Sequence, residues 1–152
     1  MKSAFIINPF SAKKNYQPFV DELHKKVDNP LYLVSQSLED TEDFIRRVWN
    51  DVDIFVAVGG DGTISVVAQK LINTNKILAV FPAGSGNGFS NETNFNKNIS
   101  RLLEKIEAKQ SREIDTFMVN DHFSINVSGT GFDGKVVKEF EKTSRGFKNY
   151  IK

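Results

Sequence analysis

The sequence predicts an α/β fold in which helices cover both faces of a parallel sheet, giving three layers. Short apolar runs rich in β-branched and aromatic residues alternate along the chain with longer segments whose apolar residues recur at helical spacing. Strands that alternate with helices in this way form parallel sheets. Strands are expected at residues 3–8, 31–34, 54–58 and 77–81, and helices at residues 16–27, 39–49, from Thr63 onward, and at 99–108.

The alternation of strands and helices ends near Ser111, where we place a domain boundary. Residues 112–119 and 122–128 are two apolar-alternating runs joined by Asn120-Asp121, which is typical of an antiparallel hairpin. A helical segment follows at residues 135–142. We therefore expect an α/β lobe over residues 1–110 and, over residues 111–152, the beginning of a β-rich second lobe that is incomplete within this chain.

Composition excludes several classes of protein. The 20 basic and 19 acidic residues leave a net charge of +1, so no electrostatic footprint for nucleic acid is present. The chain has no cysteine, which rules out disulfides and thiolate metal sites. No apolar run approaches the roughly 20 residues of a membrane-spanning helix, and the amino terminus does not match a signal peptide. The expected location is the cytoplasm, with contact at the inner face of the membrane left open.

The most informative motif is Gly59-Gly60-Asp61-Gly62-Thr63, between a buried strand and a helix. Given roughly 7% glycine in proteins, this pentapeptide arises by chance in on the order of one chain of this length in ten thousand. The unpaired N–H groups at the start of a helix that follows such a turn bind phosphate. A more ordinary explanation for the paired glycines is a turn that requires positive φ.

Asp61 adds chemistry that a turn does not need. A carboxylate beside a phosphate site repels its ligand unless a metal ion or a proton-donating hydroxyl lies between them. Asp61 therefore suggests either binding of a Mg²⁺-nucleotide or deprotonation of an accepting hydroxyl.

Two further loops are expected at the same edge of the sheet, because the carboxyl ends of parallel strands meet there. Asn8, Pro9 and Ser11 follow the first strand and offer a stiff turn with polar side chains. The loop at residues 82–89 alternates glycines with Ser85 and Asn87, which allows close backbone approach and hydrogen bonding to a ligand.

These segments together resemble the diacylglycerol kinase catalytic-domain family, which includes bacterial lipid kinases and the sphingosine and ceramide kinases. The resemblance spans nearly the whole chain, and its N-terminal, nucleotide-binding portion is the part represented here. The matching segments, in the family's order and spacing, are residues 7–11, 58–63, 81–89 and 123–133.

The resemblance implies a role for each loop. Residues 8–12, with Asn8, Pro9, Ser11 and Ala12, would hold nucleotide phosphates. Residues Gly59, Gly60, Asp61, Gly62 and Thr63 would bind the triphosphate, with Asp61 as the catalytic residue near Mg²⁺. Gly84, Ser85 and Asn87 would complete the nucleotide site. Ser35 is the best match to a hydroxyl at the end of the second strand, with Ser37 as a substitute.

Two departures from the family matter. Gly88 stands where the family has an acidic residue, which alters the charge of the loop and leaves the acceptor open. Such kinases are also roughly twice as long, and their β-rich second lobe carries the acceptor pocket, further metal ligands and the general base. No metal ligand is therefore assigned within this chain.

The leading hypothesis is an ATP-dependent lipid kinase, or its nucleotide-binding fragment, that transfers the γ-phosphate of ATP to a lipid hydroxyl. ATP and Mg²⁺ are the implied cofactors, and a nucleotide and a lipid alcohol are the implied partners. Membrane contact and a homo-oligomer are left open. The alternatives are an NAD kinase-like phosphotransferase, in which Asp61 acts on a ribose hydroxyl, and a non-catalytic nucleotide-binding module.

Overall fold

The computed structural model of the protein describes residues 1–11, 15–126, 128 and 131–141. The chain divides into two compact units, Met1–Ile114 and Asp115–Lys152.

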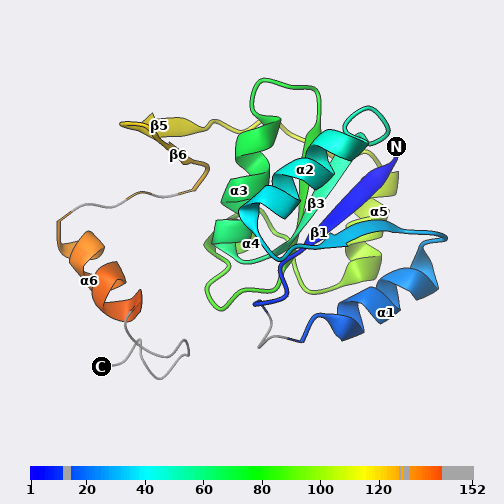
Figure 1. Ribbon diagram of the computed structural model, residues 1–152, viewed down its shortest axis with the longest axis horizontal. Helices are drawn as coiled ribbons and strands as arrows, with labels where there is room; N and C mark the ends of the chain where they lie inside the picture. The colour runs from blue at the N-terminus through cyan, green and yellow to red at the C-terminus, as the bar shows by residue number, and fades with distance from the viewer. Residues whose placement is uncertain (12–14, 127, 129–130, 142–152) are drawn as a thin grey trace. The chain divides into compact units, whose positions relative to one another are not determined.

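The first unit is built on a four-stranded sheet whose strands all run parallel (Figure 1). The order across the sheet is β2-β1-β3-β4. The strands are β1 (Ser3–Ile7), β2 (Leu31–Val34), β3 (Ile54–Gly59) and β4 (Ile77–Pro82). Every residue of the interior strand β3 is buried, as expected of a continuous apolar run with helices on both sides. The predicted parallel α/β architecture is confirmed.

Helices lie on both faces of this sheet, which gives the three predicted layers (Figure 1). One face is covered by α1 (Gln17–Lys26) and α5 (Ile99–Glu107), and the other by α2 (Leu38–Val48) and α3 (Asp61–Leu71). Successive side chains of a strand point to opposite faces, so each strand supplies both layers of core.

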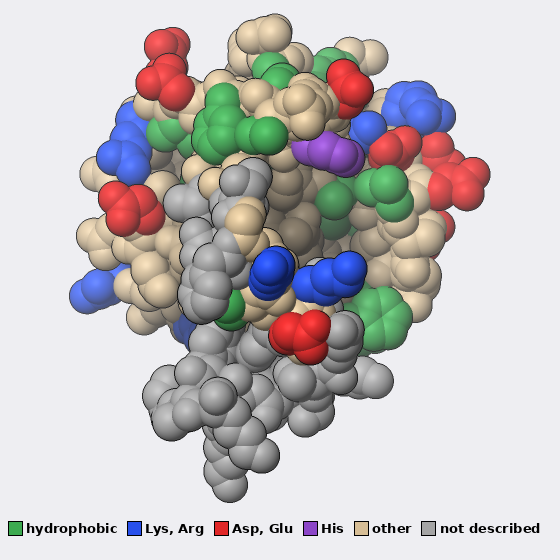
Figure 2. All heavy atoms as spheres, turned by 90° about the vertical axis from the view of Figure 1, so that its left-hand side faces the viewer, with side chains coloured by type: hydrophobic (Ala, Val, Ile, Leu, Met, Phe, Trp, Pro, Cys, Tyr) green, Lys and Arg blue, Asp and Glu red, His purple; other side chains and the backbone are tan. Residues whose placement is uncertain are grey.

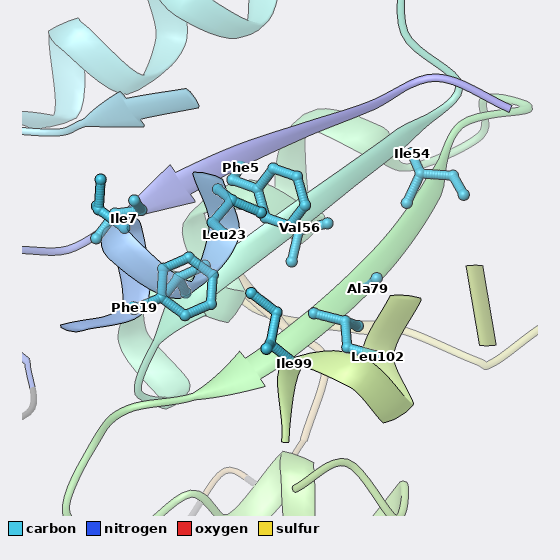
Figure 3. Close-up of a cluster of buried hydrophobic side chains, with 11 residues drawn as sticks. Phe5, Ile7, Phe19, Leu23, Ile54, Val56, Ala79, Ile99 and Leu102 are labelled. Carbon is cyan, nitrogen blue, oxygen red and sulfur yellow. The ribbon is translucent and has the colours of Figure 1, made fainter. Parts of the chain in front are cut away.

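The core beneath α1 and α5 is visible in Figure 3, where Phe5, Phe19 and Leu23 meet between β1 and α1. The rings of Phe5 and Phe19 lie 6.2 Å apart, and those of Phe19 and Phe81 lie 4.6 Å apart. Burying such rings contributes roughly 1.5–3 kcal/mol each. Ile99 and Leu102 bring α5 onto the same cluster (Figure 3). The amphipathic patterns in the sequence thus place each helix on the sheet.

Two features of the helices differ from expectation. Helix α3 begins at Asp61 rather than Thr63, because an acidic residue in the first turn interacts favourably with the helix dipole. A short helix, α4 (Gly88–Glu92), was not predicted. It follows Asn87, whose φ of 57° places that residue in the left-handed region that asparagine tolerates better than most residues.

The second unit contains a small antiparallel hairpin formed by β5 (Phe117–Val119) and β6 (His122–Ser124), followed by α6 (Phe132–Glu141). The predicted hairpin is present, with Asn120 in its turn at a φ of 54°, but its strands are shorter than expected. Residues 112–116 form no strand, since a strand needs a hydrogen-bonded neighbour and no strand among the described residues pairs with this exposed stretch. The α6 helix begins earlier than predicted, and Lys142 lies outside the described residues. That this unit opens a β-rich lobe stays a prediction.

Charged side chains of both signs are interspersed over the face drawn in Figure 2, in keeping with the balanced composition. Among the described helices, none combines the length and apolar character needed to cross a bilayer.

Candidate nucleotide site

The candidate site lies where the direction of the sheet's winding reverses. The chain passes from β1 to β2 on one side and then returns to β3 on the other side of β1. In open parallel sheets, ligands bind beyond the carboxyl ends of the strands at such a switch point. Asn8 follows β1 and Gly60 follows β3, so both lie at this position.

The loop after β1 is fixed by Asn8. Its side-chain Oδ1 accepts a hydrogen bond from the Phe10 N–H at 2.9 Å, which is an Asx turn of the kind its sequence favours. Its Nδ2 donates to Thr63 Oγ1 at 2.9 Å, and the backbone N–H of Ser11 donates to the Asn8 carbonyl at 3.2 Å. Pro9 lies half-buried within the turn. Ala12 lies outside the described residues. Asn8 therefore joins the β1 loop to the start of α3.

The first glycine loop, residues 59–63, contains no positive φ, so the ordinary explanation for its paired glycines is wrong. Close approach explains them instead. A Cβ on Gly59 would overlap the Thr63 side chain, and a Cβ on Gly60 would lie 3.2 Å from the Gly84 Cα. Gly62 differs from both, because a Cβ there would meet nothing within 4 Å.

The second glycine loop, residues 82–88, packs directly against the first. A Cβ on Gly84 would lie 2.5 Å from the Gly60 Cα, too close for any side chain without a backbone shift. Asn87 closes the loop on itself: its Oδ1 accepts from the Gly84 N–H and its Nδ2 donates to the Gly84 carbonyl, both at 2.8 Å. Ser85 is exposed on the loop. The sequence indicated backbone approach to a ligand here, and the structure shows backbone approach between the two glycine loops.

The half-buried carboxylate of Asp61 also contacts the second loop. Its Oδ1 accepts from the Phe89 N–H at 2.9 Å, and its Oδ2 accepts from the Gly88 N–H at 3.1 Å. Both oxygens therefore bind consecutive amides at the beginning of α4.

An open cavity of about 250 Å³ lies beside these loops, between the ends of β1 and β2 and the helices α2 and α3. Four of the predicted residues line it, namely Asn8, Ser35, Gly62 and Thr63. Ser35 is held by its own hydroxyl, which donates to the Ser37 carbonyl at 2.8 Å and lies 2.7 Å from Thr41 Oγ1. Ser37 lines the cavity as well, and its hydroxyl caps α2 by accepting from the Asp40 N–H at 3.0 Å.

Sequence reasoning missed the apolar side of this cavity. Phe10 and Leu38 line it and are 60% and 57% exposed, which is unusual for large apolar side chains. Val66 of α3 and Thr41 of α2 also line it. No sequence signal identified them, because a turn residue such as Phe10 and the first residue of a helix such as Leu38 can each be either buried or exposed.

Residues 2–119 match the family model described as the diacylglycerol kinase catalytic domain. The chain therefore belongs to the diacylglycerol kinase catalytic-domain family, a family of lipid kinases, as its motifs indicated.

Two proteins with similar sequences match most of this chain. The chain is 27% identical over 140 residues to the diacylglycerol kinase of Bacillus subtilis, covering 86% of this chain and 46% of that protein. It is 28% identical over 161 residues to an uncharacterized protein of Synechocystis, covering 96% of this chain and 36% of that protein. The chain thus spans between a third and a half of the length of these relatives. A crystal structure of a diacylglycerol kinase from Bacillus anthracis shares the fold, with a TM-score of 0.60 at 23% identity over 76% of this chain and 42% of that one.

Proposed function

We propose that this chain binds a Mg²⁺-nucleotide at the carboxyl edge of its parallel sheet and is the nucleotide-binding part of an ATP-dependent lipid kinase. The kinase would transfer the γ-phosphate of ATP to a lipid hydroxyl. Family membership supports a kinase acting on a lipid, and the geometry of the first glycine loop supports the nucleotide.

The observation that carries the proposal is the open space over Gly62. The amides of the first turn of α3 have no partners within the helix, and they lie beside residues that are otherwise tightly packed. Gly59 and Gly60 are glycines because protein atoms approach them, whereas nothing in the described residues approaches Gly62. Gly62 is exposed and lines the cavity, so its missing side chain leaves room for an anion at the helix N-terminus.

The cavity would take the nucleoside end of the same ligand. Its volume of about 250 Å³ is close to the lower end of ligand pockets, which are mostly apolar with a few polar groups that fix orientation. Phe10 and Leu38 offer apolar surface for a base, and the Ser35 hydroxyl offers a hydrogen bond to a sugar.

The residues present fit a magnesium ion that arrives with the nucleotide. Mg²⁺ usually binds one or two carboxylates together with substrate phosphates and water, rather than an all-protein cage. Asp61 provides one carboxylate beside the phosphate position, and its oxygens each keep a second lone pair after accepting their amides. The described residues contain no cluster of three or more His, Cys, Asp or Glu side chains. When bound, the ion would neutralise charge on the transferring phosphoryl group.

In the proposed reaction the acceptor hydroxyl oxygen bonds to the γ-phosphorus as the bond from that phosphorus to the β–γ bridging oxygen breaks. ADP leaves, and the acceptor's proton passes to a base. The contribution of this chain is to position the phosphates and stabilise their charge, which is most of what phosphoryl transfer requires of a protein.

A transfer assay with radiolabelled γ-phosphate tests the proposal, using diacylglycerol in mixed micelles, sphingosine and NAD as separate acceptors, with this chain alone and with the chain joined to a complete second lobe of a relative. Label in a lipid product is expected when the complete second lobe is present. The chain alone is expected to bind nucleotide and to transfer phosphate slowly or not at all, because the family's acceptor pocket and general base lie in that lobe. Label in NAD alone would replace the lipid assignment with the NAD kinase-like alternative. Nucleotide binding without transfer to any acceptor, even with the complete second lobe present, would show a non-catalytic binding module and contradict the proposed reaction.

A further inference from the structure

We infer that Asp61 is a positioning residue whose carboxylate latches the second glycine loop onto the first. This latch consists of the two hydrogen bonds from the Gly88 and Phe89 amides to Asp61. The inference deepens the proposed function. The latch is a property of the protein without nucleotide, and only the ATP-affinity test below rests on the proposed function.

The geometry of the latch is specific. The two amides are consecutive in the chain and lie 27 and 28 residues beyond Asp61. The contact is therefore not a local turn but joins two separate loops. Each donates to a different carboxylate oxygen, at 3.1 and 2.9 Å. Hydrogen bonds from backbone amides to an ionised carboxylate are roughly twice as strong as neutral ones. A single side chain therefore fixes the position of two consecutive residues, Gly88 and Phe89.

The contacts around Asp61 show how the position of the second glycine loop can affect the first. The backbones of Gly60 and Gly84 are in contact, and the two loops can approach this closely only because neither residue has a side chain. The Ala83 N–H donates to the Gly59 carbonyl at 2.8 Å, which extends the pairing of β3 with β4 up to this contact. On the far side, the buried Phe89 anchors α4 in the protein. The carboxylate thus lies between a fixed strand end and a fixed helix.

Asp61 is also the first residue of α3, so the latch acts on the amides proposed to bind phosphate. A shift of the second loop would move Gly84 against Gly60 and change the direction of those amides. The carboxylate can therefore raise nucleotide affinity through the loops, whether or not it also binds a metal ion.

Two measurements test the inference on Asp61→Ala and Asp61→Asn. The first is amide hydrogen exchange of Gly88 and Phe89 by NMR, without nucleotide. In Asp61→Ala we expect both amides to exchange at least about tenfold faster, because each loses a charge-assisted partner. Asp61→Asn keeps one acceptor oxygen and is expected to restore protection to one of the two amides. Unchanged exchange in Asp61→Ala would overturn the latch.

The second measurement is ATP affinity with Mg²⁺ and with the metal chelated. A residue that acts only through the metal would not help metal-free ATP, and its negative charge would repel it. A positioning residue is needed in both conditions, so Asp61→Ala should lower affinity in both, with Asp61→Asn intermediate. A loss confined to the Mg²⁺ condition would overturn the positioning role.

The matched control is Asp53→Asn. Asp53 also accepts a backbone N–H through one carboxylate oxygen, from Lys2 at 2.9 Å, but at the opposite edge of the sheet. It should leave the exchange of Gly88 and Phe89 and the ATP affinity unchanged. If the wild-type chain binds no ATP in either condition, the proposed function fails, and hydrogen exchange alone decides the latch.

Discussion

The two edges of the parallel sheet use polar side chains in different ways. At the amino edge, the Lys76 ammonium donates to the carbonyls of Trp49 and Val52, both at 2.6 Å, and lies over the Trp49 ring. These bonds hold the residue before β4 against the carbonyls of the segment between α2 and β3. At the carboxyl edge, Asn8 and Asp61 also join segments distant in sequence, but there they lie beside an open cavity. The Lys76 contacts at the amino edge satisfy backbone carbonyls, whereas the contacts at the carboxyl edge hold backbone amides in place beside an open cavity.

The largest effect on stability is expected from Gly84→Ala, at the backbone contact between the glycine loops. Its Cβ would lie 2.5 Å from the Gly60 Cα, so the backbone must move, and we expect a loss of about 3 kcal/mol in the free energy of unfolding. ATP affinity should fall with it. Gly86→Ala is the control, because a Cβ at Gly86 would lie 3.7 Å from its nearest neighbour, an Asp61 oxygen. Denaturant unfolding of both variants checks this, and equal stabilities would contradict the packing argument.

Lys76→Met tests the amino edge. The substitution keeps much of the side-chain volume but leaves the two carbonyls without their charged donor. We expect the free energy of unfolding to fall by about 2 kcal/mol. The affinity for ATP, measured by titration, should stay unchanged. A loss of affinity in a folded Lys76→Met protein would show that the two edges are not separate in function.

Removal of a helix cap compares a residue that lines the cavity with one that does not, at a smaller scale. Ser37 caps α2 beside the cavity, and Asn98 caps α5 by accepting from the Arg101 N–H at 3.1 Å. Ser37→Ala and Asn98→Ala should each lower the free energy of unfolding by about 1 kcal/mol. Only Ser37→Ala should weaken ATP binding, since Ser37 lines the cavity. Equal affinities in these two variants would argue against the cavity as part of the site.

The smallest effect on stability is expected from Gly62→Ala. The new Cβ meets nothing within 4 Å and the residue has no positive φ. Alanine also favours a helix over glycine, so unfolding should become harder by about 0.5 kcal/mol. Thermal unfolding of the variant checks this, and a marked destabilisation would mean that Gly62 is required by the fold itself.

Much of the fold could be predicted because burial leaves a clear pattern in the sequence. The continuous apolar run of β3 and the spaced Ile64, Val67 and Ala68 of α3 gave the correct elements, since nearly all of these side chains are fully buried. The short α4 could not be found in this way. It follows a left-handed Asn87 and its first amides bind Asp61, so its position depends on a contact distant in sequence.

The sequence predicted which loops come together at the candidate site, but not the contacts between them. Parallel topology was enough to bring Asn8 and the first glycine loop to one edge of the sheet. The sequence could not show that Gly84 faces Gly60, nor that Asn87 bonds to Gly84, because both depend on loop conformation. The exposed Phe10 and Leu38 became informative only when they were found beside a cavity.

The central claim is that the amides at the start of α3 bind the phosphates of a nucleotide through the space left by Gly62. Isothermal titration of the wild-type chain and of Gly62→Ala with ATP and Mg²⁺ tests it most directly. We predict saturable heat for the wild type and at least about tenfold weaker binding for a variant that is no less stable, because a side chain would occupy the anion position. No heat from folded wild-type protein, or equal affinity in the two proteins, would contradict the claim.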